Sequence, residues 1–132
     1  MSKPLVDVAL ALVYRQGRWL VARRPAQSHL GRFWEFPGGK RAPGEDPPQA
    51  AIRELREECG VEAVAERLLD PITHDYGDRV VRLTPVICRW VAGEPRPLGN
   101  EACCWVNPQE LRDLMMPEIN KRIVTALIQP AD

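Results

Sequence analysis

The stretch that constrains this chain most runs from Gly39 to Val61 and reads GKRAPGEDPPQAAIRELREECGV. Its residues predict a helix with a marked start and end. Asp46 can cap the helix, and Gln49 completes a capping box three residues later. Pro47 suits the first helical position, and Gly60 stands where a left-handed residue commonly ends a helix. We therefore expect a helix between Asp46 and Gly60.

Carboxylates gather on one face of this expected helix. Glu57 and Glu58 follow Glu54 by three and four positions, which confines the side chains to an arc of about 100°. Like charges at Glu54 and Glu58 destabilise a helix by roughly 0.2–0.5 kcal/mol. A solvated charged face is the ordinary explanation. The functional explanation is that a divalent cation supplies the missing counter-charge, and carboxylate oxygens suit Mg²⁺ or Mn²⁺.

The spacing of these residues resembles the signature of the Nudix hydrolase family, G-x5-E-x7-R-E-U-x-E-E-x-G-U, in which U is a bulky aliphatic residue. The chain meets every fixed position, with Gly39, Glu45, Arg53, Glu54, Leu55, Glu57, Glu58, Gly60 and Val61. The resemblance implies a loop-helix-loop metal site that hydrolyses a nucleoside diphosphate linked to another group. It implies Mg²⁺ as the cofactor, with Mn²⁺ able to substitute.

Pattern and turn residues predict the other elements. Apolar or alternating runs predict strands at 6–14, 18–23, 79–91 and 102–106, a short strand near Trp34, and extended chain over 63–76. Pro85 inside the 79–91 run indicates an edge strand or a bulge. Capping patterns predict a short helix after Asn107 and a last helix from near Pro117. These elements imply an α+β fold, a Nudix-type α/β/α sandwich with a mixed sheet, and residues 1–132 are expected to form one domain.

Almost the whole chain is similar to the MutT-type branch of the family. The matching segments outside the signature are Arg23-Arg24 with His29, Glu35 to Lys40, Asp78-Arg79 and Asn120. This similarity implies hydrolysis of nucleoside triphosphates, including oxidised ones such as 8-oxo-dGTP, to monophosphate and pyrophosphate, which cleanses the nucleotide pool. A sister group with similar RPAQS and WEF segments acts on modified cytosine nucleotides and carries Asp where this chain has Asn120.

Other functions remain as alternatives. One is hydrolysis of CTP, a modified dCTP or a dinucleoside polyphosphate, which a Nudix signature alone does not exclude. The other is a non-catalytic module that binds nucleotides. The intact carboxylates argue against the second, since a pure binder has no need to tolerate their mutual repulsion.

The resemblance also implies a role for individual residues. Metal binding is assigned to the carbonyl of Gly38 and to Glu54, Glu57 and Glu58. Arg53 would orient Glu54, Glu45 would shape the loop, and one of the three glutamates or Glu101 would take the proton from the attacking water. The expected substrate-binding residues are Arg23, Arg24, His29, Trp34, Phe36, Gly38, Gly39, Lys40, Arg79 and Asn120.

The aromatic and amide residues of this set have ordinary explanations as well. Trp34 and Phe36 share one face of an extended segment, and such a pair is usually core, but here it directly precedes the metal loop, where a base could stack. Asn120 would read the base, because an amide both donates and accepts hydrogen bonds. The alternative is that Asn120 caps or decorates a surface helix.

The composition limits the kinds of partner that the chain is expected to bind. Lys plus Arg and Asp plus Glu are 18 each, so net charge favours neither nucleic acid nor an acidic membrane surface. No apolar run approaches the roughly 20 residues that span a bilayer, and no signal-peptide pattern is present. The cysteines lack C-x-x-C spacing, which favours core residues or free thiols of a reducing compartment over a zinc site. We expect a cytoplasmic monomer or small homo-oligomer that binds a nucleoside triphosphate.

Overall fold

The computed structural model describes residues 3–128. The elements are β1 (Leu5–Arg15), β2 (Arg18–Arg23), β3 (Trp34–Glu35), β4 (Gly38–Lys40), α1 (Pro47–Cys59), β5 (Glu62–Leu68), β6 (Ile72–Asp75), β7 (Val80–Ala92), β8 (Ala102–Val106), α2 (Pro108–Asp113) and α3 (Glu118–Leu127). The predicted helices and strands are therefore confirmed, with ends that shift by a residue or two. No helix among the described residues is long and apolar enough to span a membrane.

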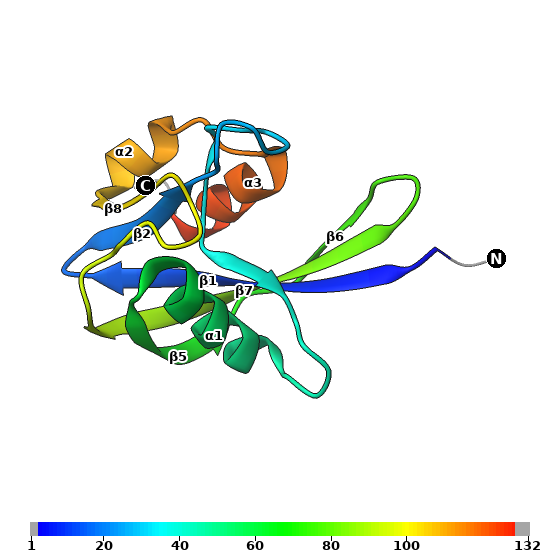
Figure 1. Cartoon of the computed structure of the whole chain (residues 1–132), viewed down its shortest axis with the longest axis horizontal. Coiled ribbons are helices and arrows are strands. Elements are labelled where there is room, and N and C mark those ends of the chain that lie inside the picture. The colour runs from blue at the N-terminus through cyan, green and yellow to red at the C-terminus, as the bar shows by residue number, and fades with distance from the viewer. Residues whose placement is uncertain (1–2, 129–132) are drawn as a thin grey trace.

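The strands form one mixed sheet. Its main path runs β3-β2-β1-β7-β5, while β4 pairs with β1, β6 with β7 and β8 with β2. β1 and β7 pair in parallel, and the other strand pairs are antiparallel. In Figure 1 the start of β1 and the β6–β7 hairpin extend away from the rest of the molecule. The predicted α+β architecture with a mixed sheet is confirmed.

Each face of the sheet has its own core. Alternation along β1 sends Ala9, Ala11 and Val13 to the face that α1 covers, where they join Leu55 and Cys59. The other face carries Leu10 and Leu12 and is covered by α2 and α3 through a further set of buried residues, Leu111, Ile119, Ile123 and Val124. Figure 1 shows α1 apart from the neighbouring α2 and α3. Small side chains under α1 let the helix that carries the glutamates lie close to the sheet.

The predicted ends of α1 are confirmed. The Asp46 carboxylate accepts a hydrogen bond from the Gln49 N–H, and the Gln49 side chain accepts one from the Asp46 N–H. At the other end, Gly60 has a φ of 68° and donates its N–H to the Arg56 carbonyl. Both ends of the helix are therefore set by residues adjacent to it in the chain.

Pro85 does not have the position that the sequence suggested. It lies in β7, which has β1 on one side and β5 and β6 on the other, so it is not in an edge strand. β5 pairs with β7 as far as Val86 and β6 pairs from Leu83, so Pro85 lies at the junction between the two partner strands. Its carbonyl accepts a hydrogen bond from Leu69 N at this junction. A missing N–H is tolerated there because no ladder partner needs it.

Candidate active site

The glutamate face of α1 lies directly against the two glycines of strand β4. Glu58 Oε2 accepts a hydrogen bond of 2.8 Å from the Gly38 N–H. A Cβ atom on Gly39 would come within 2.7 Å of the Glu54 carboxyl carbon, and one on Gly38 within 2.2 Å of the Ala9 carbonyl oxygen. Only glycine leaves room for this approach. The helix α1 and the strand β4 thus form one acidic surface, which carries the glutamates.

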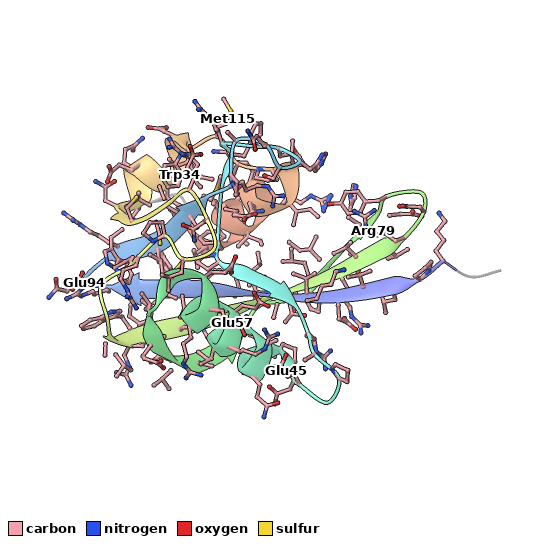
Figure 2. The ribbon with its side chains drawn as sticks, in the orientation of Figure 1. Trp34, Glu45, Glu57, Arg79, Glu94 and Met115 are labelled. Carbon is pink, nitrogen blue, oxygen red and sulfur yellow. The ribbon has the colours of Figure 1, made fainter. Side chains whose placement is uncertain are left out.

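Arg53 holds the remaining carboxylates of this surface. Its Nη1 donates to Glu54 Oε1 at 2.9 Å and to Glu57 Oε2 at 3.1 Å. Its Nε donates to Glu45 Oε2 at 2.7 Å, and its Nη2 donates to the Lys40 carbonyl at 3.0 Å. One guanidinium therefore ties the helix to the loop before it and to the end of β4. Figure 2 shows Glu57 on α1 and Glu45 on that loop.

The charges of the site shift the ionisation of its carboxyl groups. Burial raises the pKa of Glu58 to about 8, and the charges of Glu54 and Glu35 add to this rise, while the Gly38 N–H opposes it. The hydrogen bonds from Arg53 and from the Ala42 N–H lower the pKa of Glu45 to about 2. Arg53 therefore keeps Glu45 ionised, whereas burial favours the protonated form of Glu58.

This arrangement fits a divalent cation. No group of three or more His, Cys, Asp or Glu side chains within residues 3–128 is already gathered as a metal cage. The reason is that Arg53 holds Glu54 and Glu57, while Gly38 holds Glu58. Mg²⁺ suits such a site, because it binds oxygen, takes few protein ligands and keeps waters. Burial raises the pKa of Glu58, so a bound cation would favour the ionised form of its carboxyl, which is the form that binds a metal.

A second group of charged residues lies at the ends of β2 and β3. Arg23 forms an ion pair of 3.3 Å with Glu101, and its guanidinium lies 5.6 Å from the Trp34 ring centre. Arg24 Nη1 donates to Glu35 Oε1 at 2.9 Å. The atom of Arg23 that faces Glu101 is Nε, which is buried and forms no hydrogen bond with the described residues.

Asn120 is buried, with 7% of its surface exposed. Its Oδ1 accepts the Phe36 N–H at 3.2 Å, so it does not act as a helix cap. Phe36 is 1% exposed and belongs to the core, so its ring offers no open surface for stacking, contrary to the expectation from the sequence. Trp34 is only partly buried and keeps that possibility.

The side chains of three expected substrate-binding residues take no part in the hydrogen bonds and ion pairs described above. Arg79 is exposed at the β6–β7 turn, where it pairs with Asp78 at 3.1 Å, and Figure 2 shows it far from Glu57. His29 is exposed, and its backbone carbonyl, not its ring, accepts a bond from Arg24 Nε. The Lys40 side chain is exposed, and its carbonyl contacts Arg53.

The sequence interpretation overlooked Glu35 and Asn100. Burial raises the pKa of Glu35, the Arg24 guanidinium opposes this, and the Glu35 charge in turn acts on Glu58. Alternation along residues 34–36 could have revealed Glu35, because it puts this carboxyl opposite the two aromatic rings. Asn100 Nδ2 donates to the Glu58 carbonyl at 3.1 Å. No local pattern marks Asn100, since the contact joins a loop to a distant helix.

The mixed sheet between helices, with the glutamate-bearing helix α1 packed against the glycines of β4, is the Nudix fold. A profile of the NUDIX domain matches residues 8–126, and the chain belongs to this family. It is therefore a hydrolase of the nucleotide diphosphatase class.

The relatives of this chain include 8-oxo-dGTP diphosphatases and a CTP pyrophosphohydrolase. The 8-oxo-dGTP diphosphatase of Proteus vulgaris is 41% identical over 85 residues, which cover 64% of this chain and 76% of the relative. The 8-oxo-dGTP diphosphatase of Escherichia coli K12 is 29% identical over 124 residues, 92% of this chain and 95% of the relative. The CTP pyrophosphohydrolase of Escherichia coli K12 is 35% identical over 106 residues, 80% of this chain and 78% of the relative.

Solved structures agree on the fold. The solution structure of the E. coli ORF135 protein superposes with a TM-score of 0.85 at 30% identity, covering 98% of this chain and 96% of the other. The crystal structure of a MutT protein from Methanosarcina mazei Go1 gives a TM-score of 0.82 at 22% identity, covering 96% and 94%, and supports the fold alone.

Proposed function

We propose that this chain is a Mg²⁺-dependent nucleoside triphosphate pyrophosphohydrolase of the MutT type. Its substrates would be oxidised nucleotides such as 8-oxo-dGTP, hydrolysed to monophosphate and pyrophosphate, so that they are removed before DNA replication. The observation that carries the proposal is the glutamate face of α1 held against Gly38 and Gly39. Phosphoryl transfer depends mainly on positioning and on charge neutralisation, which such a face supports.

The chain's own residues have distinct tasks in this reaction. The Gly38 carbonyl, Glu54, Glu57 and Glu58 would hold a Mg²⁺ ion, which neutralises phosphate charge and lowers the pKa of water. Arg53 keeps Glu54 and Glu57 on one side of the helix through its hydrogen bonds. One of these glutamates or Glu101 takes the proton of the attacking water.

Recognition of the base falls to Asn120 in this proposal. The Phe36 N–H can only donate, so it fixes which way the amide points. Asn120 then keeps one lone pair on Oδ1 and two N–H donors for a ligand. Guanine presents hydrogen-bond acceptors at O6 and N7, and its 8-oxo form carries a hydrogen on N7. The O6 acceptor and the N7–H donor of the 8-oxo form can therefore pair with the N–H donors and the Oδ1 acceptor of an amide. Cytosine presents an amino donor, which a carboxylate would suit better.

The second candidate is a CTP or modified dCTP pyrophosphohydrolase. It is favoured by the relative of that activity, which matches 80% of this chain at 35% identity. The amide at Asn120 argues for the first candidate, because an ionised Asp in its place could only accept hydrogen bonds.

Measuring kcat/KM for 8-oxo-dGTP, dGTP and a hydroxylated dCTP tests the proposal, with pyrophosphate as the product measured. Wild type should prefer 8-oxo-dGTP over the dCTP by more than about 200-fold, because an apolar pocket alone supplies less. Asn120→Ala should lose most of this ratio, and Asn120→Asp should move preference toward the cytosine nucleotide. Asn107→Ala removes an exposed amide that caps α2 and should keep the wild-type ratio.

A wild-type preference for the cytosine nucleotide would replace the first candidate with the second. If Asn120→Ala kept the wild-type ratios, Asn120 would not read the base. Pyrophosphate release from none of the nucleotides would reject both candidates.

A further inference from the structure

The carboxyl end of α1 brings two cysteines into one environment. Cys59 is the last residue of α1, directly after Glu58, and is fully buried. Cys103 lies on β8 and is partly buried, packed against the same core cluster as Cys59. The next residue, Cys104, is also partly buried but packs against the cluster on the opposite face of the sheet. All four cysteines of the chain are free thiols.

The loop between β7 and β8 connects the two thiols. Arg96 donates its N–H to the Cys59 carbonyl at 2.9 Å, and its own carbonyl accepts a bond of 3.3 Å from Cys103 Sγ. Asn100 Nδ2 lies 3.8 Å from Cys59 Sγ. Both thiols therefore lie beside this loop and against the same core cluster.

The pair is asymmetric in a way that suits stepwise oxidation. Cys103 is reachable from solvent, whereas Cys59 is not. A thiol that an oxidant can reach, with a second and buried thiol beside the same loop, is the usual arrangement of an oxidation-sensitive pair.

We propose that Cys59 and Cys103 form a reversible disulfide when the protein meets a hydroperoxide, and that this bond switches the hydrolase off. The Cys103 thiolate attacks one peroxide oxygen, the O–O bond breaks, and Cys103 becomes a sulfenic acid while water leaves after protonation. The Cys59 thiol then attacks the Cys103 sulfur, the S–O bond breaks, and a second water leaves. Two thiols lose two electrons and two protons, and the peroxide is reduced to two waters.

The position of Cys59 explains why the bond would stop hydrolysis. The two sulfur atoms must approach to a bond of about 2.05 Å with a restricted torsion, so the last turn of α1 or the start of β8 must shift. Glu58 precedes Cys59 and holds Gly38 at 2.8 Å, so a shift there displaces the glutamate face. A displacement of about 1 Å can lower a rate about 100-fold. This effect on activity rests on the proposed function, whereas bond formation does not.

The first experiment measures the bond itself. The full-length reduced protein is treated with hydrogen peroxide, and its intact mass and peptide map are recorded. We expect the mass to fall by the two hydrogens of one disulfide, with Cys59 and Cys103 in one linked peptide. Cys103→Ser should form no such link. Cys104→Ser, altered at the neighbouring position on the opposite face of β8, should form it as readily as wild type. Linkage of other cysteines, or none in wild type, overturns the proposal.

The second experiment measures nucleotide hydrolysis by the same samples. Oxidation should lower the rate of wild type and of Cys104→Ser more than tenfold, and dithiothreitol should restore it. Cys103→Ser should be active and insensitive to the same treatment. A disulfide that leaves the rate unchanged would reject the switch. If the reduced protein hydrolysed no nucleotide, the proposed function would fail, and the mass measurement would still decide whether the pair forms its bond.

Discussion

At the scale of single residues, one guanidinium organises most of the acidic surface. Arg53 contacts Glu45, Glu54 and Glu57, whereas Glu58 is held by the Gly38 N–H. Hydrogen bonds with Glu45 and then Glu54 raise the pKa of Arg53, so it stays charged. The carboxylates are therefore positioned before any ligand arrives, and Arg53 would need to share them with a metal.

Glu57→Gln tests the role of this surface with almost no change in size. Removal of a ligand charge should lower the rate of Mg²⁺-dependent hydrolysis by more than about 100-fold. Loss of a residue that only supports a metal ligand already lowers activity by about 10- to 100-fold. Stability should change little, because Glu57 is 58% exposed and surface ion pairs contribute less than about 1 kcal/mol. Steady-state rates and thermal unfolding measure the two effects.

A matched control for this change is Glu62→Gln. Glu62 is also an exposed glutamate paired with an arginine, Arg56, but it lies on β5 outside the acidic surface. It should keep wild-type rates. Equal rates in Glu57→Gln and wild type would remove Glu57 from the metal site.

At the scale of elements, α1 and α2 begin with the same capping arrangement. Asp46 and Gln49 form the capping box of α1, and Asn107 and Glu110 form that of α2. Only α1 carries the glutamate face, and the loop before it carries Glu45, which holds Arg53. The two caps thus offer a comparison between a helix that positions the site and one that does not.

Asp46→Ala and Asn107→Ala should each lower the free energy of unfolding by about 1 kcal/mol, because each leaves a helix N–H without its partner. For a chain of this size that corresponds to a fall of about 4 °C in Tm. Well below Tm, Asp46→Ala should also lose several-fold in activity, since Glu45 next to it loses its fixed position, while Asn107→Ala should not. Equal activity losses would mean that α1 positions the site without its cap. Thermal unfolding and steady-state rates at 25 °C are the measurements.

At the scale of the whole molecule, acidic residues bind segments that are distant in the chain. Asp7 on β1 accepts hydrogen bonds of 2.8 and 3.1 Å from Arg82 on β7, which supports the parallel strand pair. The hydrogen bond from Arg82 lowers the pKa of Asp7. Glu45 ties its loop to α1 in the same manner through Arg53. Protonation of such groups removes these links, so acid should weaken the fold.

Glu45→Gln isolates one part of this acid sensitivity. The folded pKa of Glu45 is about 2, below the value of about 4.3 for an unfolded chain. Its stabilisation is therefore complete above about pH 4.3 and is lost as the pH falls toward 2. The urea midpoint of wild type should fall more steeply between pH 5 and pH 2.5 than that of Glu45→Gln. Parallel curves for the two proteins would contradict the assigned pKa.

The features that the sequence alone determined are those that depend on interactions between residues close together in the chain. The caps of α1 and α2 and the shared face of Glu54, Glu57 and Glu58 depend on residues no more than four positions apart, so spacing predicted them. Apolar or alternating runs likewise predicted β1, β2, β7 and β8.

The tertiary structure alone decided which of these residues meet. Asn120 reaches Phe36 across 84 positions, and this contact makes it a buried group instead of a surface cap. The junction of β5 and β6 places Pro85 inside the sheet, and the loop after β7 contacts both Cys59 and Cys103 through Arg96. Such contacts depend on how whole elements pack, and no periodicity within one element carries that information.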